Sequence, residues 1–268
     1  MTLLKRILTA LSLIILTATS IIFGKIPFYL LILTISLICL HEMHTIKGIR
    51  KYSFGYSISM LITCLVITSA TFQEYIFFWN STFIFLATFV MIVICLTELF
   101  NKQTIKKNHS LYTLIINTVI VCLTFPYALL IRNSELGFEK AILLVVVISL
   151  VDSSAYFTGK LIGKTKLSEL SPKKTFEGFF GGIMSGCIIG LVSIIILNLK
   201  ISTYFPLVIL ITLMAPIGDL YESMIKRSFN IKNSSNLLPG HGGIFDRIDS
   251  YIFCFPVFYY INILLSSL

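Results

Sequence analysis

The sequence predicts an all-α, polytopic integral membrane protein with about nine transmembrane helices. Of the 268 residues, 56% are hydrophobic and only 12% are charged, and the mean hydropathy is +0.93. A surface this apolar does not suit a soluble domain. Inside a bilayer only helices and closed barrels satisfy the backbone, and a spanning helix needs roughly 20 apolar residues. The apolar runs of this chain are continuous and do not alternate with polar residues, so helices are expected.

Nine apolar runs are the expected spans. They lie at about residues 7–23, 26–42, 55–71, 79–97, 111–131, 139–159, 178–199, 203–220 and 251–267. Tight turns separate the first from the second run and the seventh from the eighth. Lys5 and Arg6 before the first run are also typical of a signal peptide. Because no A-x-A cleavage site follows, we expect an uncleaved first span.

Basic residues predict the orientation. Lys and Arg collect in cytoplasmic loops of membrane proteins. If the N-terminus is cytoplasmic and the C-terminus outside, all of the 21 basic residues fall on the cytoplasmic side except Lys25, Arg132, Lys140 and Lys200. The net charge of +9 is then explained by orientation and by attraction to anionic lipids, and does not indicate nucleic acid binding.

The chain reads as a single membrane domain, residues 1–268. The inner connections lengthen to about 18 residues at 160–177 and about 30 at 221–250, which is too short for a soluble domain. We expect the spans of residues 1–137 to form a scaffold. The spans and cytoplasmic loops of residues 138–268 are expected to carry the chemistry.

Cysteine and histidine give little evidence for a metal site. The six cysteines all fall inside apolar runs without C-x-x-C spacing, which is typical of packing residues. The segment H-E-M-H at 41–44 places its histidines three residues apart, not the four of the zinc-protease motif. We favour a structural or substrate-edge role for Glu42.

Two carboxylates lie deep in apolar sequence, Asp152 and Asp219. Ionisable residues in such positions are functional candidates by default. If the helix carrying Asp219 continues past its inner end, one face presents the side chains of Asp219, Glu222, Ser223 and Lys226. Internal ion pairing at an interfacial helix end is the alternative explanation.

The loop that follows supplies groups suited to phosphate and to a hard cation. Lys226, Arg227 and Lys232 are cationic donors, and the three glycines of P-G-H-G-G allow backbone to approach a ligand closely. Asp246 and Asp249 stand three residues apart before the last run. Convergent carboxylates among basic residues are how proteins hold Mg²⁺ against phosphates.

Three stretches carry a family resemblance. Ser223–Asp249 reads S-x-x-K-R, then K, P-x-H-G-G and D-R-x-D. Upstream, D-S-S-A-Y-F-T-G-K-L-I-G-K runs from Asp152 to Lys164 and S-P-K-K-T-F-E-G from Ser171 to Gly178. These residues resemble the phosphatidate cytidylyltransferases, also called CDP-diacylglycerol synthases. The first 150 residues match only as generic spans. The family usually carries Asp where this chain has Asn233, so Asn233 is left out of the catalytic set and an inactive member remains an alternative.

The resemblance implies transfer of the cytidylyl group of CTP to phosphatidate, giving CDP-diacylglycerol and pyrophosphate for phospholipid biosynthesis. It implies Mg²⁺ on Asp219 and Asp246, with Asp249 as a further ligand or as a residue that orients them. The other catalytic candidates are Lys226, Arg227, His241 and Arg247. The substrate-binding candidates are Asp152, Lys173, Lys174, Ser223, Lys232, Gly242 and Gly243.

Alternatives remain at several of these points. His241 could serve only the turn, and Lys173 and Lys174 could serve only orientation. A related CTP-dependent transferase acting on another lipid is a second function. A secondary transporter is a third, disfavoured because the ionisable residues cluster at one face. A second metal ion, a homodimer and the acyl-chain preference are left open. The expected location is a bacterial inner membrane, with the site on the cytoplasmic face in contact with membrane lipids.

Overall fold

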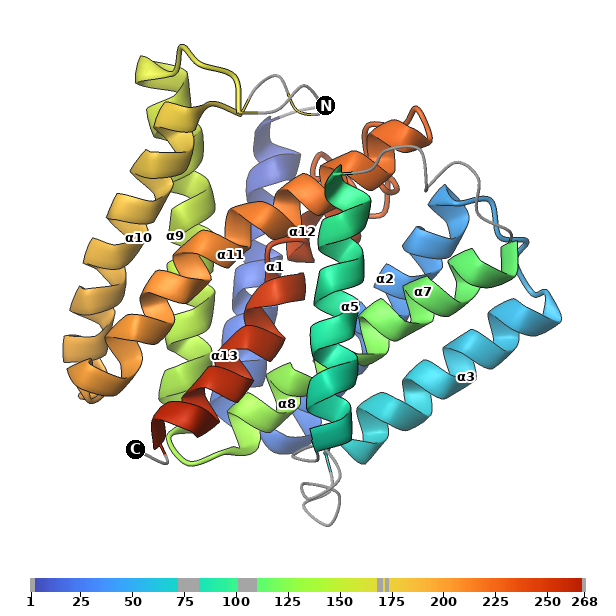
Figure 1. Ribbon diagram of the computed structural model, residues 1–268, viewed down its shortest axis with the longest axis horizontal. Coiled ribbons are helices and arrows are strands. Elements are labelled where there is room, and N and C mark those ends of the chain that lie inside the picture. The colour runs from blue at the N-terminus through green and yellow to red at the C-terminus, as the bar shows by residue number, and fades with distance from the viewer. Residues whose placement is uncertain (1–2, 72–81, 101–109, 168–170, 172–173, 267–268) are drawn as a thin grey trace.

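The computed structural model describes residues 3–71, 82–100, 110–167, 171 and 174–266, and these residues form helices joined by short loops (Figure 1). The helices in chain order are α1 (Leu3–Phe23), α2 (Lys25–Ile46), α3 (Phe54–Ser69), α5 (Thr82–Phe100), α7 (Ser110–Cys122), α8 (Phe125–Asn133), α9 (Gly137–Ile162), α10 (Phe176–Ile196), α11 (Ile201–Ser228), α12 (Phe245–Ile248) and α13 (Tyr251–Ser266). Across these described ranges there is no strand, and the β-structure consists of two isolated bridges, Lys166 with Thr175 and Leu238 with Gly242. The all-α prediction is confirmed.

Each of the nine apolar runs coincides with a helix or, in one case, with a pair of helices. The fifth run is broken between α7 and α8, where Pro126 occupies the first turn of α8. Proline cannot donate the backbone hydrogen bond that a continuous helix would need there. Five helical stretches are long and apolar enough to cross a membrane, and four more apolar helices are shorter. The number of spans and the side on which each terminus lies remain predictions.

The tight turns predicted between neighbouring spans are present. One residue, Gly24, separates α1 from α2, and its φ is 59°. Between α10 and α11 the chain reverses through Asn198, whose φ is 52°. Glycine and asparagine tolerate this left-handed conformation better than other residues, so both helical hairpins close in very few residues.

The densest helix packing lies between α9, α10 and α11. Four buried glycines recur every fourth residue along one face of α10, at positions 178, 182, 186 and 190. A Cβ at Gly186 would lie 2.4 Å from Val151 of α9 and 2.6 Å from Thr212 of α11. Small residues at this spacing let helix backbones approach closely in membranes. The glycines therefore bring α9 and α11 together against α10.

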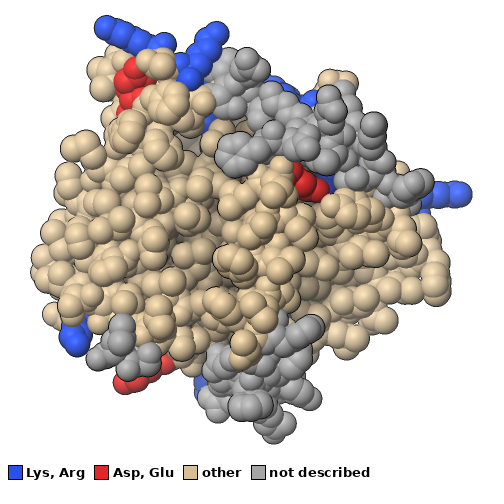
Figure 2. All heavy atoms as spheres, viewed as in Figure 1, with Lys and Arg blue, Asp and Glu red and all other residues tan. Residues whose placement is uncertain are grey.

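The surface agrees with a bilayer environment. Large apolar side chains on the outer faces of α1 and α10 are exposed, for example Ile14 at 61% and Ile188 at 62%. On the face drawn in Figure 2, Lys, Arg, Asp and Glu gather near the two ends, and the band between shows almost none. An exposed apolar belt of this kind is unfavourable in water and favourable in lipid. The protein is an integral membrane protein.

One end of the helix bundle collects the polar chain segments. The turn between α9 and α10, the loop after α11 and the short helix α12 all lie at the same end as the N-terminus in Figure 1. The C-terminal end of α11 and the start of α13 meet there as well. This end of the bundle holds the candidate site.

Candidate functional site

A polar cavity of about 310 Å³ lies where α9, α11 and the turn before α13 meet. It is lined by Asp152, Asp219, Glu222, Lys226, Asn233, His241, Asp246, Arg247, Asp249 and Ser250. Five of these side chains are carboxylic acids and two are strong bases. The polar cavity therefore carries a formal excess of negative charge.

Helix α11 supplies one wall of the polar cavity. It runs unbroken through Pro216 to Ser228, so the condition for a shared polar face past Asp219 is met. Asp219, Glu222 and Lys226 consequently face the polar cavity together. Ser223, predicted on the same face, is half-buried and does not line it.

Three carboxylates form a cluster that we call the acidic trio: Asp219, Glu222 and Asp249. One oxygen from each lies within 4.8 Å of the others. Asp219 and Glu222 come from successive turns of α11, and Asp249 comes from the turn between α12 and α13. Gly218 permits this approach, because a Cβ there would lie 2.3 Å from the Asp249 carbonyl oxygen.

Glu222 is the trio member whose environment is incomplete. Its side chain is 1% exposed, and Oε2 lies 2.6 Å from the Lys226 ammonium. Oε1 is buried and receives no hydrogen bond from any described donor. An unpaired buried carboxylate oxygen is costly, and a hard cation is the ligand that would satisfy it.

The charged form of Asp249 is unfavourable in its surroundings. Burial raises the pKa of the Asp249 carboxyl well above its ordinary value, and the nearby charges of Asp219 and Asp152 raise it further. A divalent cation between the three acids would remove this repulsion. The chemistry of the acidic trio therefore fits a divalent metal ion.

Asp246 lies beside the trio but is held differently. Its Oδ1 accepts from Lys226 Nζ at 2.7 Å, and its Oδ2 accepts from the Ser234 amide at 3.0 Å and the Gly243 amide at 2.8 Å. Burial alone would raise the pKa of Asp246, but interactions with Glu222, Lys226 and the Gly243 amide outweigh it and lower the pKa to about 2. Asp246 thus ties the 234–243 loop to Lys226. Its role as a metal ligand stays a prediction.

Glu42 of α2 organises the same loop from the other half of the chain. Its side chain is 2% exposed. It accepts hydrogen bonds from Ser234 Oγ at 2.9 Å, Ser235 Oγ at 2.6 Å, the Ile244 amide at 3.1 Å and the Phe245 amide at 2.7 Å. A Cβ at Gly243 would lie 2.5 Å from both Glu42 oxygens, so glycine is needed for this approach. Of the two roles expected for Glu42, the structural one agrees with these contacts.

The histidines beside Glu42 are engaged elsewhere. His44 is buried and pairs with Ser59 Oγ at 2.9 Å and Asn117 Nδ2 at 3.1 Å, while His41 contacts Tyr56 Oη at 2.8 Å. Within the described ranges, the acidic trio is the metal-compatible group and H-E-M-H contributes nothing to it.

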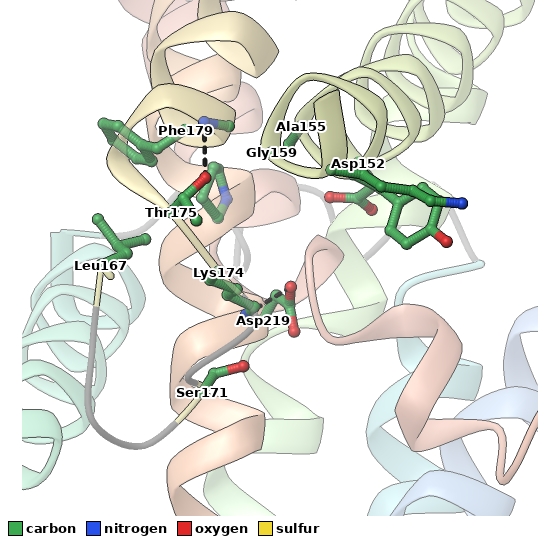
Figure 3. A pocket seen from close by; sticks show the side chains of 13 residues that line it. Asp152, Ala155, Gly159, Leu167, Ser171, Lys174, Thr175, Phe179 and Asp219 are labelled. Atoms are coloured by element: carbon green, nitrogen blue, oxygen red, sulfur yellow. Dashed lines mark hydrogen bonds and ion pairs between the residues drawn. The ribbon is translucent and has the colours of Figure 1, made fainter. Parts of the chain in front are cut away.

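A second cavity, of about 560 Å³, adjoins the first between α9, the start of α10 and α11. It is lined by Asp152, Ala155, Tyr156, Gly159, Lys160, Leu167, Ser171, Lys174, Thr175, Gly178, Phe179, Pro216 and Asp219. Lys174 reaches across it, with its Nζ 2.5 Å from Asp219 Oδ2 (Figure 3). Asp152, fixed by the Ser250 hydroxyl at 3.1 Å, lines both cavities, as does Asp219. We call this space the α9–α10 cavity.

Of the remaining predicted residues, some line the polar cavity and others do not. Arg247 lines the polar cavity, and its Nε donates to the His241 carbonyl at 3.2 Å. His241 also lines it and pairs through Nδ1 with Thr9 Oγ1 of α1 at 2.8 Å. Arg227 donates to the Ile231 carbonyl at 3.0 Å, and neither Arg227 nor Lys232 lines the two cavities. Gly242 and Gly243 are buried in the loop, and Lys173 lies outside the described residues.

Two residues of the site were absent from the predicted set. Glu222 shows a sequence signal, because it follows Asp219 by three residues on one helix face. Glu42 shows almost none, since its partners are about 200 residues away in the chain. Asn233, left out because it lacks a charge, nevertheless lines the polar cavity.

Comparison with known proteins identifies the family of this chain. The sequence profile described as the cytidylyltransferase family matches residues 4–265. A phosphatidate cytidylyltransferase of Bacillus subtilis is 32% identical over 268 residues, covering 98% of each chain. One from Staphylococcus haemolyticus is 29% identical over 267 residues, 98% of this chain and 99% of its own. One from Synechocystis is 42% identical over 136 residues, 50% of this chain and 46% of its own. This chain belongs to the cytidylyltransferase family.

Proposed function

We propose that this protein transfers the cytidylyl group of CTP to phosphatidate, giving CDP-diacylglycerol and pyrophosphate. The observation that carries the proposal is the acidic trio beside Lys226 and Lys174, in a polar cavity at one end of a membrane-embedded helix bundle. The full-length similarity to proteins named phosphatidate cytidylyltransferase supports this choice of substrates.

The reaction needs no protein nucleophile. An anionic oxygen of phosphatidate attacks the α-phosphorus of CTP, a new P–O bond forms, and the bond to the β-phosphate oxygen breaks so that pyrophosphate leaves with that electron pair. Two polyanions must therefore be aligned and their charge neutralised. The side chains of the two cavities suit that task better than they suit acyl transfer or hydrolysis.

Mg²⁺ is the cofactor that fits the polar cavity. The acidic trio offers three oxygens within 4.8 Å of one another, including the unpaired Glu222 Oε1, and oxygen is the ligand that Mg²⁺ prefers. We propose Asp219, Glu222 and Asp249 as the direct ligands. When bound, the ion would offset charge on the phosphates. Asp246 would hold Lys226 and the 234–243 loop in place beside it.

The cationic residues divide between two sides of the trio. Lys174 and Lys160 line the α9–α10 cavity, which is large enough for a nucleotide, so we assign that cavity to CTP. Lys226 and Arg247 line the polar cavity and would hold the lipid phosphate and the departing pyrophosphate. Lys174 would leave Asp219 for the nucleotide phosphates once a metal ion takes its place.

The position of the site suits these substrates. Phosphatidate keeps its acyl chains in the bilayer with its phosphate at the interface, whereas CTP is dissolved in the cytosol. A site at the polar end of the bundle meets both, and we assign that end to the cytoplasmic face of a bacterial inner membrane. The C-terminal half would then carry the reacting groups, while Glu42 of the N-terminal half positions their loop.

The test is a transfer assay on purified protein. Radiolabelled CTP, Mg²⁺ and a panel of lipid acceptors should yield lipid-soluble label with phosphatidate and not with diacylglycerol or phosphatidylinositol. Label with another acceptor would redirect the substrate assignment, and no label with any acceptor would refute the transferase. Chelation by EDTA should stop the reaction, and Mg²⁺ should restore it.

Asp246→Asn is the matching variant. It removes the charge that pairs with Lys226 at 2.7 Å, so we expect Mg²⁺-dependent turnover to be abolished while the protein still purifies as a folded membrane protein. Near-normal activity in this variant would remove Asp246 from the site. Arg227→Gln is the control, because Arg227 lies outside both cavities and should leave turnover within about threefold.

A further inference from the structure

A third cavity, of about 280 Å³, adjoins the polar cavity at Arg247. Its walls come from α1, α2, α8, α9, α12, α13 and the loop before α12, and almost all of the lining side chains are apolar. We call it the apolar cavity.

The apolar cavity meets the polar cavity at α12. Arg247 lines both. The next four residues divide between the two, since Ile248 and Tyr251 line the apolar cavity while Asp249 and Ser250 line the polar one. The chain from α12 into α13 therefore forms a partition with a charged group at its edge.

The long dimension of the apolar cavity runs along the helices. Along α1 it is lined from Leu13 to Ile21, and along α9 from Ala141 to Ser149. Eight residues of helix rise about 12 Å. The cavity thus extends from the polar end of the bundle toward the other end, which is the direction of an acyl chain in a bilayer.

Helix α1 forms one wall of this cavity and is attached by hydrogen bonds near both of its ends. At its outer end, Arg132 of α8 donates from Nε and Nη2 to the Ile21 carbonyl at 2.9 and 2.7 Å. At the polar end, Thr9 Oγ1 contacts His241 Nδ1 at 2.8 Å. Ile14 lies between these two attachments, lines the cavity and is 61% exposed. A side chain that lines the cavity is thus also exposed on the apolar surface of the bundle.

We infer that the apolar cavity holds an acyl chain of the phosphate-bearing lipid substrate while Arg247 holds the phosphate at its mouth. The inference rests on the proposed function. The inference is based on how the two cavities connect. The apolar cavity runs along the helices and ends at Arg247, and Arg247 also lines the polar cavity that holds the acidic trio. Burial of methylenes in such a cavity favours long chains over short ones.

Two adjacent valines of α9 provide a matched test. Val145 and Val146 are both half-buried, but Val145 lines the apolar cavity and Val146 does not. Val145→Phe should lower kcat/KM for dioleoyl-phosphatidate at least about tenfold relative to dihexanoyl-phosphatidate. Val146→Phe should leave this ratio unchanged.

The outcomes separate the inference from the proposed function. A wild-type protein that converts neither phosphatidate would refute the transferase activity. A wild type active on both, with the same ratio in Val145→Phe as in Val146→Phe, would overturn the acyl-chain site alone. That result is also what a permanently bound structural lipid in the cavity would produce.

A second measurement covers the case in which Val145→Phe does not fold. Phosphatidate with a photoreactive diazirine in the middle of one acyl chain should crosslink the wild-type protein at α1 or α9 side chains of the apolar cavity. Excess unlabelled dioleoyl-phosphatidate should compete the crosslink away. Crosslinks confined to the exposed face of α10, around Ile188, would overturn the inference.

Discussion

Two buried glutamates at the same end of the bundle have opposite environments. Glu42 of α2 is 2% exposed, and four donors from one loop satisfy its two oxygens. Glu222 of α11 is 1% exposed, and one of its oxygens is paired with Lys226 while the other receives no described hydrogen bond. A fully satisfied buried carboxylate holds the chain in place. A half-satisfied one, crowded by two further acids, is ready for a ligand.

The two environments are mechanically linked. The loop that Glu42 holds contains Ser234 and Gly243, whose amides donate to Asp246, and Asp246 in turn pairs with the Lys226 that contacts Glu222. A substitution of Glu42 should therefore affect turnover by displacing the loop, Asp246 and Lys226. A change at Glu222 should reach it through metal affinity.

Among the variants that compare these two environments, the largest effect is expected for Glu222→Gln. Loss of one ligand charge should lower turnover by about three orders of magnitude, or about 4 kcal/mol, and raise the Mg²⁺ concentration needed for half-maximal rate. Stability without Mg²⁺ should fall, because the variant removes the charge that pairs with the Lys226 ammonium at 2.6 Å. Titration of rate with Mg²⁺ and a thermal melt in detergent check both statements. An unaltered Mg²⁺ dependence would contradict the role assigned to Glu222.

Glu42→Gln comes next. In this variant an NH₂ group, which donates hydrogen bonds, replaces one carboxylate oxygen that accepted them. The free energy of unfolding should therefore fall by about 3 kcal/mol, and turnover should fall ten- to a hundredfold. The Mg²⁺ concentration needed for half-maximal rate should stay at the wild-type value. If Glu42→Gln shifted Mg²⁺ dependence as far as Glu222→Gln does, the distinction between the two glutamates would fail.

A smaller effect is expected for Lys174→Gln. Lys174 pairs with Asp219 at 2.5 Å from the α9–α10 cavity, so its loss should raise the KM for CTP about tenfold and leave the KM for phosphatidate unchanged. Lys166→Gln is the matched control, since Lys166 is exposed and lines neither cavity. Equal effects at both positions would point to general charge attraction and not to a nucleotide contact.

The smallest effect is expected for Ser235→Ala. Its hydroxyl is one of four donors to Glu42, at 2.6 Å, and the other three remain in the variant. We expect a loss of about 1 kcal/mol in stability and turnover within about threefold of the wild type. A loss as large as that of Glu42→Gln would show that the loop depends on this hydroxyl alone.

Much of the fold could be predicted from the sequence because its signals are local. Every apolar run became a helix or a pair of helices. The continuation of α11 past Asp219 was only the condition under which its polar residues would share a face, and the structure meets that condition. The break between α7 and α8 shows the limit of this approach. Pro126 marked it in the sequence, but the surrounding run is apolar throughout.

The site was predicted only in part. Asp152, Asp246 and Asp249 belong to the family pattern and line one polar cavity. Asp219, predicted because it lies deep in apolar sequence, lines the same cavity. Arg227 and Lys232 belong to the same pattern, yet they lie outside both cavities. Arg227 follows Lys226 on α11, so the helical period turns its side chain away from the cavity. The direction of Lys232 depends on how the loop after α11 folds, which a pattern of residue types does not encode.

By itself the sequence determined the class of the protein, its helices and the segment that carries its ionisable residues, because hydrophobicity and helical period act over short stretches of chain. Tertiary structure decided which acids meet. It joined Asp249 to α11 through the close approach at Gly218, and placed Glu42 under a loop about 200 residues away. Those contacts depend on helix packing across the bundle, and packing is a property of the whole fold.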